Sequence, residues 1–245
     1  MCVSSRGLTA GGPNERPSPG FVIVGFDGSP ASTVAIGWAT REAAARGLIL
    51  RISSGTTSKG DLRRALVEVA EQADLLVLST SNDESAETVL LSSLARKALR
   101  RSPCPVVIIR GTRTERVRNI VIGVDGSGAS NSALDWACIE ASMHGADLVV
   151  VHSPQGDVSR AEAECVVKLA INECRERTDV DVRGVLAEGS PELALIDASR
   201  DADIVAIGSR GRGGFKTVVF GSVALAVAEG ADCPVAVIHP TPRLD

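Results

Sequence analysis

The sequence is poor in aromatic residues. It contains no Tyr, and aromatic residues make up only 2% of its 245 residues. A core for such a chain must consist of Val, Ile, Leu and Ala, which is typical of parallel sheets covered on both faces. Because hydrophobic residues make up 44% and charged residues 23%, we expect one large or two small domains with substantial cores.

Zinc ligands in a recognisable pattern are also missing. The chain has three His, and none of its six Cys form a pair with C-x2-C spacing. The scarcity of His and the absence of C-x2-C pairs predict no zinc or other metal site, and the cysteines favour no disulfide framework, as in a reducing cytoplasm. We therefore predict that the cysteines are mostly small core residues. They are Cys2, Cys104, Cys138, Cys165, Cys174 and Cys233.

Neither an excess of positive charge nor a long apolar run is present. The net charge of −4 disfavours nucleic acid as a partner. No apolar run approaches the ~20 residues that span a membrane, so no membrane partner is expected. Residues 1–20 are rich in Gly, Pro and Ser and lack the apolar centre of a signal peptide, so we predict a disordered segment and a cytoplasmic protein.

Glycine, in contrast, is concentrated in one stretch. Residues 208–222 read GSRGRGGFKTVVFGS and follow an apolar run, 203–208, that is typical of a buried parallel strand. A strand, a glycine-rich loop and a helix together present backbone N–H groups and a helix dipole to an anion. With Arg210, Arg212 and Lys216 in the loop, the stretch predicts a phosphate site. The remaining alternative is that the glycines only shape a turn.

The chain contains an internal duplication. Asp27-Gly28-Ser29 recurs as Asp125-Gly126-Ser127, and Trp38 recurs as Trp136, each 98 positions later. Near the end of each copy, Cys104-Pro105-Val106 recurs as Cys233-Pro234-Val235, now 129 positions later. The first copy has therefore lost 31 residues, and the pattern places the loss after its second strand.

Both copies alternate strands with helices, which predicts parallel sheets with right-handed crossovers. The expected fold is α/β, with two tandem Rossmann-like three-layer domains, the first of which lacks one strand and one helix. The predicted boundaries are a disordered segment at 1–20, domains at 21–110 and 119–240, and a linker at 111–118. The longest helix is expected over 159–177, and its predicted buried face carries Val158, Ala161, Cys165 and Leu169.

The spacing of Gly208, Gly211 and Gly221-Ser222 is neither that of a P-loop nor that of the dinucleotide fingerprint. It resembles the G-x2-G-x9-G-S/T motif of the ATP-binding branch of the universal stress protein family. Over residues 21–239 the chain resembles a tandem member of that family, with its adenine nucleotide alpha hydrolase-like fold. The resemblance implies a nucleotide-dependent stress-response regulator or sensor that binds ATP, with or without Mg²⁺, in its second domain.

The resemblance also implies a set of binding residues. It places Asp125 beside the adenine or ribose, the backbone near Ser153 against adenine, and the glycine motif around ribose and phosphates. His152 is interpreted as a structural histidine at a strand end. The complete implied set is Gly123, Asp125, Ser153, Ile207, Gly208, Arg210, Gly211, Gly221, Ser222 and Val223.

The first copy departs from this motif. Ser79, Asn82 and Ser92-Ser93 replace the glycines, and Asp83, Glu84 and Glu87 would repel a phosphate. We therefore expect a non-binding partner domain. The resemblance implies that the two domains pair through their last strands, 105–110 and 234–239, and it allows a homodimer as well.

No Ser of the predicted site has an evident His partner, so a non-enzymatic protein is favoured. Two alternatives remain open at this stage. One is an α/β enzyme of the adenine-nucleotide hydrolase type. The other is a nucleic-acid-binding protein that uses the Arg/Gly loop, residues 209–215.

Overall fold

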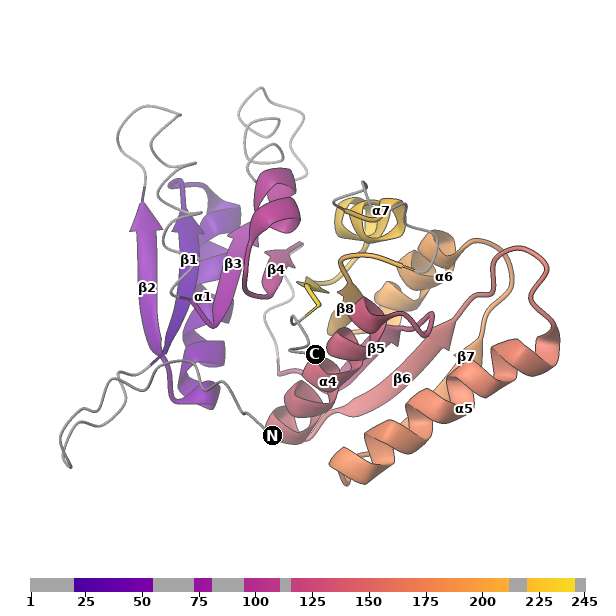
Figure 1. Cartoon of the computed structure of the whole chain (residues 1–245). Coiled ribbons are helices and arrows are strands. Elements are labelled where there is room, and N and C mark those ends of the chain that lie inside the picture. Colours follow the sequence, from indigo (N-terminus) through magenta and orange to yellow (C-terminus); the bar gives the residue numbers. More distant parts are fainter. Residues whose placement is uncertain (1–19, 55–72, 81–94, 111–115, 212–219, 241–245) are drawn as a thin grey trace, which may run out of the picture.

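The computed structural model describes residues 20–54, 73–80, 95–110, 116–211 and 220–240. The strands of these residues form one nine-stranded sheet in the order β2-β1-β3-β4-β9-β8-β5-β6-β7 (Figure 1). All neighbouring strands are parallel except β4 and β9. The predicted α/β class with parallel strand pairing within each half is confirmed.

The first half contains β1 (Phe21–Phe26), α1 (Pro30–Arg46), β2 (Ile49–Ser54), β3 (Leu75–Ser79) and β4 (Val106–Ile109), and residues 95–101 are helical. The second half contains β5 (Asn119–Gly123), α4 (Gly128–His144), β6 (Asp147–His152), α5 (Arg160–Arg177), β7 (Val182–Leu186), α6 (Pro191–Ala198), a 3-10 turn (Ser199–Asp201), β8 (Ile204–Gly208), α7 (Ser222–Gly230) and β9 (Val235–Ile238). Within the described ranges, β7 and α5 have no counterpart in the first half.

The repeated sequence produces the same helix ends in both halves. At the start of α1, the Ser29 side chain accepts a hydrogen bond from the Ser32 N–H, and Ser127 accepts one from Ser130 in the same way at the start of α4. Such N-caps satisfy donors that a helix leaves unpaired. Each helix ends at a glycine in the left-handed region, with φ of 65° at Gly47 and 63° for the equivalent residue of α4.

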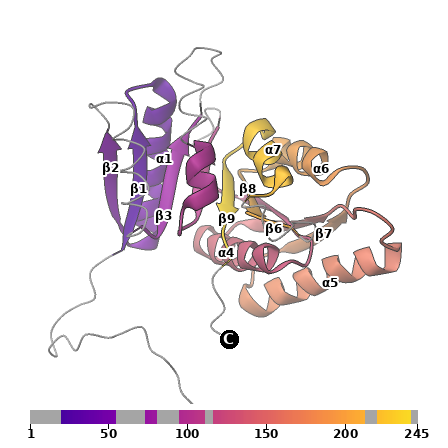
Figure 2. The ribbon, with the colours of Figure 1, turned by 45° about the horizontal axis from the view of Figure 1, so that its top comes forward.

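The sheet is covered on both faces, which gives three layers (Figure 2). On one face, α1, α4 and α5 pack on strand residues such as Val22, Ile120 and Leu148. On the other face, the helical residues 95–101 with α6 and α7 pack on residues such as Leu76 and Val205. Successive apolar side chains along each strand point to opposite faces and contribute to the core on each face, as expected for a doubly covered sheet.

The two halves meet along β4 and β9. These strands are antiparallel, with Val106 opposite Val237, Val107 opposite Ala236 and Ile108 opposite Val235. All residues of both strands are buried. Because each strand covers the edge of the other half's sheet, neither presents unpaired backbone groups at this junction.

One predicted helix face is wrong. In α5 the buried residues are Ala163, Val167, Ala170 and Cys174, whereas Cys165 is exposed and Leu169 is 61% exposed. Apolar residues lie on more than one side of this helix, so spacing alone allowed two stripes. Contact with β6 and β7 selects the stripe that is buried. The four other cysteines in the described ranges are buried, as predicted.

Candidate functional site: a pocket at the carboxyl edge of the second half

A pocket of about 850 Å³ opens at the carboxyl ends of β5, β6 and β8. The chain leaves β5 through α4 on one face of the sheet and leaves β8 toward α7 on the other face, so the strand order switches between these two strands. A switch of this kind leaves a crevice in which α/β proteins bind ligands. The volume lies within the range of about 300–1,000 Å³ for small-molecule sites.

All ten residues that the sequence suggested as binding residues line this one pocket. They come from four separate parts of the chain, which are the ends of β5, β6 and β8 and the start of α7. They are Gly123, Asp125, Ser153, Ile207, Gly208, Arg210, Gly211, Gly221, Ser222 and Val223. The fold therefore brings together residues that are up to about a hundred positions apart in the sequence.

The turn after β5 holds the loop after β8. The Asp125 carboxylate accepts a hydrogen bond from the Ser127 N–H at 2.9 Å, which closes a tight turn with Gly126 at φ 74°. The Ser127 hydroxyl donates to the Arg210 carbonyl at 3.4 Å. This pair of contacts fixes the first part of the glycine-rich loop beside the Asp125 carboxylate.

The three glycines of the motif differ in how strongly the packing around them requires a glycine. A Cβ on Gly208 would lie 2.6 Å from the Ala129 carbonyl carbon, so β8 can approach the start of α4 only through a glycine. A Cβ on Gly211 would lie 2.7 Å from an Asp125 carboxylate oxygen. At Gly221, in contrast, the nearest atom would be 3.4 Å away, so packing alone does not require a glycine there.

The start of α7 faces the pocket without a side-chain cap. Its N-cap is Gly221, and among the described residues no side chain accepts a hydrogen bond from the first turn. Gly221, Ser222, Val223 and Ala224 all line the pocket. A helix start with uncapped N–H groups and a positive dipole end is a suitable place for an anion.

Two polar side chains that line the pocket near the end of β6 form hydrogen bonds with backbone carbonyls. His152 Nδ1 lies 2.7 Å from the Val124 carbonyl, which fits a ring that donates a hydrogen bond from Nδ1. The Ser153 hydroxyl donates to the Gly189 carbonyl at 2.7 Å. His152 is thus a hydrogen-bonded residue at a strand end, as interpreted from the sequence, and the backbone near Ser153 forms the pocket wall.

Arg100 lines the pocket and was not foreseen. It belongs to the helical residues 95–101 of the first half and is exposed. Because β4 and β9 are antiparallel, the residues that precede β4 lie beside the carboxyl edge of β8 and β9. No feature of the sequence links Arg100 to this site, since its position depends on how the two halves join.

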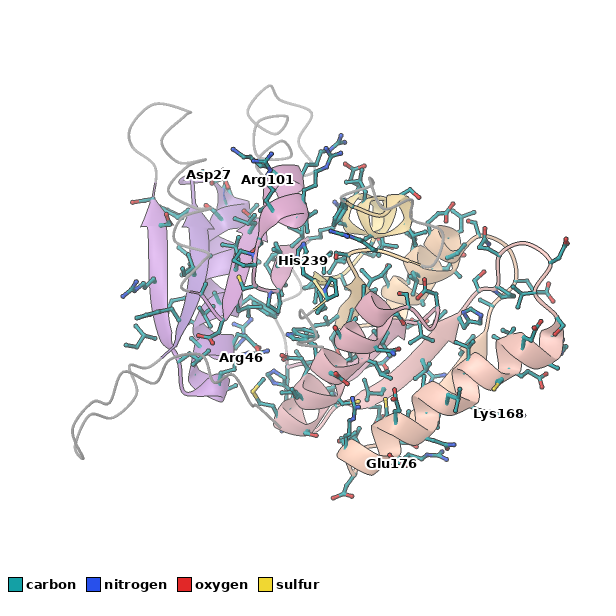
Figure 3. All side chains as sticks on the ribbon, viewed as in Figure 1. Asp27, Arg46, Arg101, Lys168, Glu176 and His239 are labelled. Carbon is teal, nitrogen blue, oxygen red and sulfur yellow. The ribbon has the colours of Figure 1, made fainter. Side chains whose placement is uncertain are left out.

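In the first half, the turn after β1 is the same as that after β5. The Ser29 N–H donates to the Asp27 carboxylate at 3.0 Å, with Gly28 at φ 84°. Although burial raises the pKa of Asp27, hydrogen bonds from Ser29 lower it below its usual value. Asp27 lies at the end of β1 (Figure 3), where it shapes a helix start. The acidic residues 83, 84 and 87 lie outside the described residues.

Comparison with known proteins shows to which family this architecture belongs. The model of the universal stress protein family matches the chain twice, at residues 54–110 and 116–239. A universal stress protein of Mycobacterium tuberculosis, Rv2623, is 31% identical over 282 aligned positions that cover 88% of this chain and 95% of the relative. The chain belongs to the universal stress protein family. It has two tandem domains of that family, as its sequence suggested.

Other members differ in length or sequence. The M. tuberculosis universal stress protein Rv2005c is 32% identical over 188 positions, and the alignment covers 70% of this chain but only 64% of that protein. A solved universal stress protein from Archaeoglobus fulgidus has a TM-score of 0.68 at 16% identity and covers 91% of this chain and 97% of its own. This likeness supports the fold of both halves together. Among the helices that the structure describes, none is both long and apolar enough to cross a bilayer.

Proposed function

We propose that this universal stress protein binds one ATP per chain in the pocket of its second half and acts as a nucleotide-dependent regulator or sensor. The observation that carries the proposal is the convergence of the ten motif residues on one pocket of about 850 Å³. A nucleotide site needs residues from separate parts of the chain, because base, ribose and phosphates need different surroundings.

The pocket has an apolar part and an anion-binding part. Val151, Leu195 and Ile207 line one region and suit the faces of an adenine ring. The uncapped start of α7, with Arg210 and Arg100, supplies N–H groups and positive charge for phosphates. The Asp125 carboxylate also lines the pocket and suits a ribose hydroxyl, which can donate to it. Bound ATP would bring Mg²⁺ with it.

A regulatory role is favoured over catalysis because the described lining offers few reactive groups. Asp125 is the one carboxylate and His152 the one imidazole among the lining residues that the structure describes. Asp125 accepts the Ser127 N–H, and His152 Nδ1 pairs with the Val124 carbonyl. Both side chains are thus already hydrogen-bonded to backbone groups, and we assign neither a catalytic role.

In this proposal the first half is a scaffold. Its β4 covers the edge of β9, and its Arg100 lines the pocket of the other half. Its own strand end carries Ser79 in the place of Gly208. Residues 21–110 would thus be a partner domain, and residues 119–240 the nucleotide-binding domain.

The test combines identification of the nucleotide with a titration. Mass spectrometry of the purified chain should detect a bound adenine nucleotide, and calorimetry with Mg-ATP should give one site per chain. Gly221→Val should abolish binding while the far-ultraviolet spectrum stays unchanged, because φ −74° and ψ 142° suit a β-branched residue. The matched control is Gly37→Val in α1, where a Cβ would be 3.8 Å from its nearest neighbour.

Two equivalent sites, or normal binding by Gly221→Val, would contradict the proposal. Binding of RNA that weakens steeply with salt, together with no nucleotide binding, would instead favour a nucleic-acid-binding function.

A further inference from the structure

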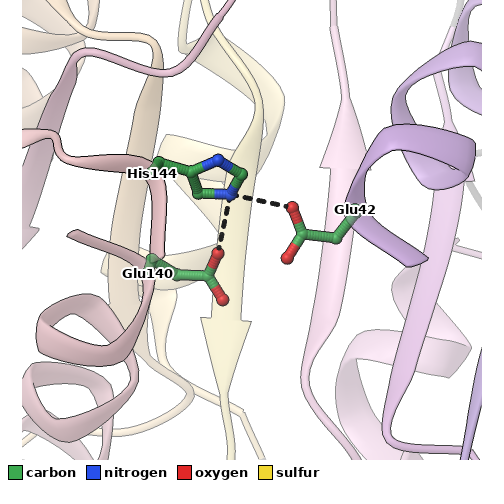
Figure 4. Close-up of side chains that lie close together, drawn as sticks. All are labelled: Glu42, Glu140 and His144. Atoms are coloured by element: carbon green, nitrogen blue, oxygen red, sulfur yellow. Dashed lines mark hydrogen bonds and ion pairs between the residues drawn. The ribbon is translucent and has the colours of Figure 1, made fainter. Parts of the chain in front are cut away.

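Four ionisable side chains meet where the two halves contact each other through α1 and α4. Glu42 and Arg46 come from α1, and Glu140 and His144 come from α4 (Figure 4 shows three of them). Glu42 and Glu140 are 98 positions apart, as are Arg46 and His144. The cluster is therefore built from equivalent positions of the duplicated unit, with a histidine in one copy where the other has an arginine.

Arg46 and His144 contact different oxygens of the two carboxylates. Arg46 Nε lies 2.5 Å from Glu42 Oε1, and Arg46 Nη2 contacts Glu140 Oε1. His144 Nε2 lies 3.2 Å from Glu42 Oε2 and 3.5 Å from Glu140 Oε2. His144 thus contacts the carboxylate oxygens that Arg46 leaves free, and one ligand atom from each of Glu42, Glu140 and His144 lies within 4.8 Å of the other two.

Both carboxylates are deeply buried. The Glu42 side chain is 2% exposed and the Glu140 side chain is 0% exposed. A buried carboxylate is costly unless charge and hydrogen bonds compensate it. Arg46 brings one positive charge for two carboxylates, and neither oxygen of Glu140 has a hydrogen-bond partner of good geometry among the described residues. A further cation on the Oε2 side of the cluster would compensate the remaining negative charge.

We propose that Glu42, Glu140 and His144 form a binding site for a divalent transition-metal ion of the zinc type, which links the two halves. Zinc–nitrogen and zinc–oxygen bonds of about 2.0–2.2 Å place tetrahedral ligands roughly 3.3–3.5 Å apart. The separations of 3.2 Å and 3.5 Å between Nε2 and the two Oε2 atoms match this spacing. Two carboxylates and an imidazole are a suitable ligand set for such an ion.

A proton on Nε2 satisfies the cluster less well. An imidazolium has one N–H at that nitrogen, which can point at only one carboxylate, and charge-assisted N–H···O bonds are about 2.7–2.9 Å long. A metal ion contacts all three ligand atoms at once. Arg46 would then hold the two Oε1 atoms and orient the carboxylates, as outer-sphere groups do at metal sites. The His144 side chain is 16% exposed, so water can reach a fourth position.

Arg46 is itself held in place. Its guanidinium carbon lies 6.0 Å from the centroid of the Trp136 ring, within the range of a cation–π contact. Because its charge already neutralises one carboxylate, we expect moderate metal affinity, in the micromolar range. Since Glu42 belongs to the first half and the other two ligands to the second, metal binding should also raise the unfolding temperature of the chain.

The test is a titration of the chelator-treated full chain with Co²⁺ and, in competition with a chromophoric chelator, with Zn²⁺. One equivalent of Co²⁺ should produce the visible bands of tetrahedral cobalt without a cobalt–thiolate band, which separates this site from binding at exposed Cys165. His144→Ala should weaken binding by at least about tenfold. His239→Asn, which changes a histidine outside the cluster, should bind as the unchanged chain does.

If His144→Ala is not folded by circular dichroism, Glu42→Gln provides the same test from the first half. Absence of stoichiometric binding in the unchanged chain overturns the proposal. Binding that survives both substitutions overturns it too.

Discussion

Arg110 of the first half caps the helix that borders the pocket of the second half. Its Nε donates to the carbonyl of Ala231 at 2.9 Å, and its Nη1 donates to that of Ala228 at 3.0 Å. Both carbonyls belong to the C-terminal end of α7, whose other end faces the pocket. A cation at a helix C-terminus complements the helix dipole and satisfies unpaired carbonyls.

Arg110→Ala should therefore lower the free energy of unfolding by about 1–2 kcal/mol, because partly buried cations at helix ends contribute up to about that much. Urea denaturation measures this loss. Arg101→Ala is the control, since Arg101 is an exposed residue of the same half. Equal stabilities of the two variants would show that the cap contributes nothing.

Arg100→Ala should weaken ATP binding by about tenfold, which corresponds to roughly 1.4 kcal/mol. Arg100 lines the pocket, so its positive charge can interact with phosphates, whereas its neighbour Arg101 does not line it. The loss should become smaller from ATP to AMP and should decrease at high salt. Calorimetric titrations of Arg100→Ala and Arg101→Ala with both nucleotides provide the comparison, and an equal effect of the two changes would argue against a role for Arg100.

Gly208→Ala and Gly221→Ser should separate structural from ligand-binding glycines. The Cβ of Gly208→Ala would lie 2.6–2.8 Å from backbone atoms of Ala129 and Ser130, so this change should cost about 1–3 kcal/mol of stability. Gly221→Ser adds a good N-cap and should keep stability within a few tenths of a kcal/mol. Its hydroxyl would occupy N–H groups at the start of α7, so ATP affinity should fall. Thermal unfolding and calorimetry distinguish the two results.

His239 should make the stability depend on pH. Burial lowers the pKa of His239, and the positive charge of Arg210 lowers it further, although the Leu99 carbonyl, 2.8 Å from Nε2, opposes this shift. His239 lies between the halves (Figure 3). Because its folded-state pKa is below the unfolded value of about 6.5, the unfolded chain binds more protons, and stability falls as the pH decreases below that value.

The measurement compares urea midpoints of the unchanged chain and of His239→Gln at about pH 7.5 and about pH 5.5, which bracket the unperturbed pKa of about 6.5. Other titrating groups contribute to both proteins. The drop should therefore be smaller in His239→Gln, and an identical drop would rule out this residue as its source.

Much of the fold follows from local sequence signals. The repeated Asp-Gly-Ser turns, the serine caps and the helix-ending Gly47 act within a few residues, so the ends of α1 and α4 depend on local sequence. The pocket residues could be collected because their spacing is specific to a family. The buried face of α5 could not be predicted, because the sheet that it covers decides between its two apolar stripes.

Contacts between the halves could not be predicted from the sequence either. Glu42 and Arg46 have the spacing of an ordinary surface ion pair on one helix, as do Glu140 and His144. Only the packing of α1 against α4 joins the two pairs in a buried cluster. Arg100 was missed for the same reason, since its place at the pocket results from the pairing of β4 with β9.

The β4–β9 pairing also sets an order of events during synthesis. β4 (Val106–Ile109) leaves the ribosome before the entire second half is made, and its pairing partner β9 (Val235–Ile238) is the last strand of the sheet to be translated. At about 5–20 residues per second, this leaves an apolar edge uncovered for on the order of 10 seconds. A nascent chain of this protein thus passes through a period in which it can associate with other nascent chains, and chaperone binding to β4 would be most useful during that interval.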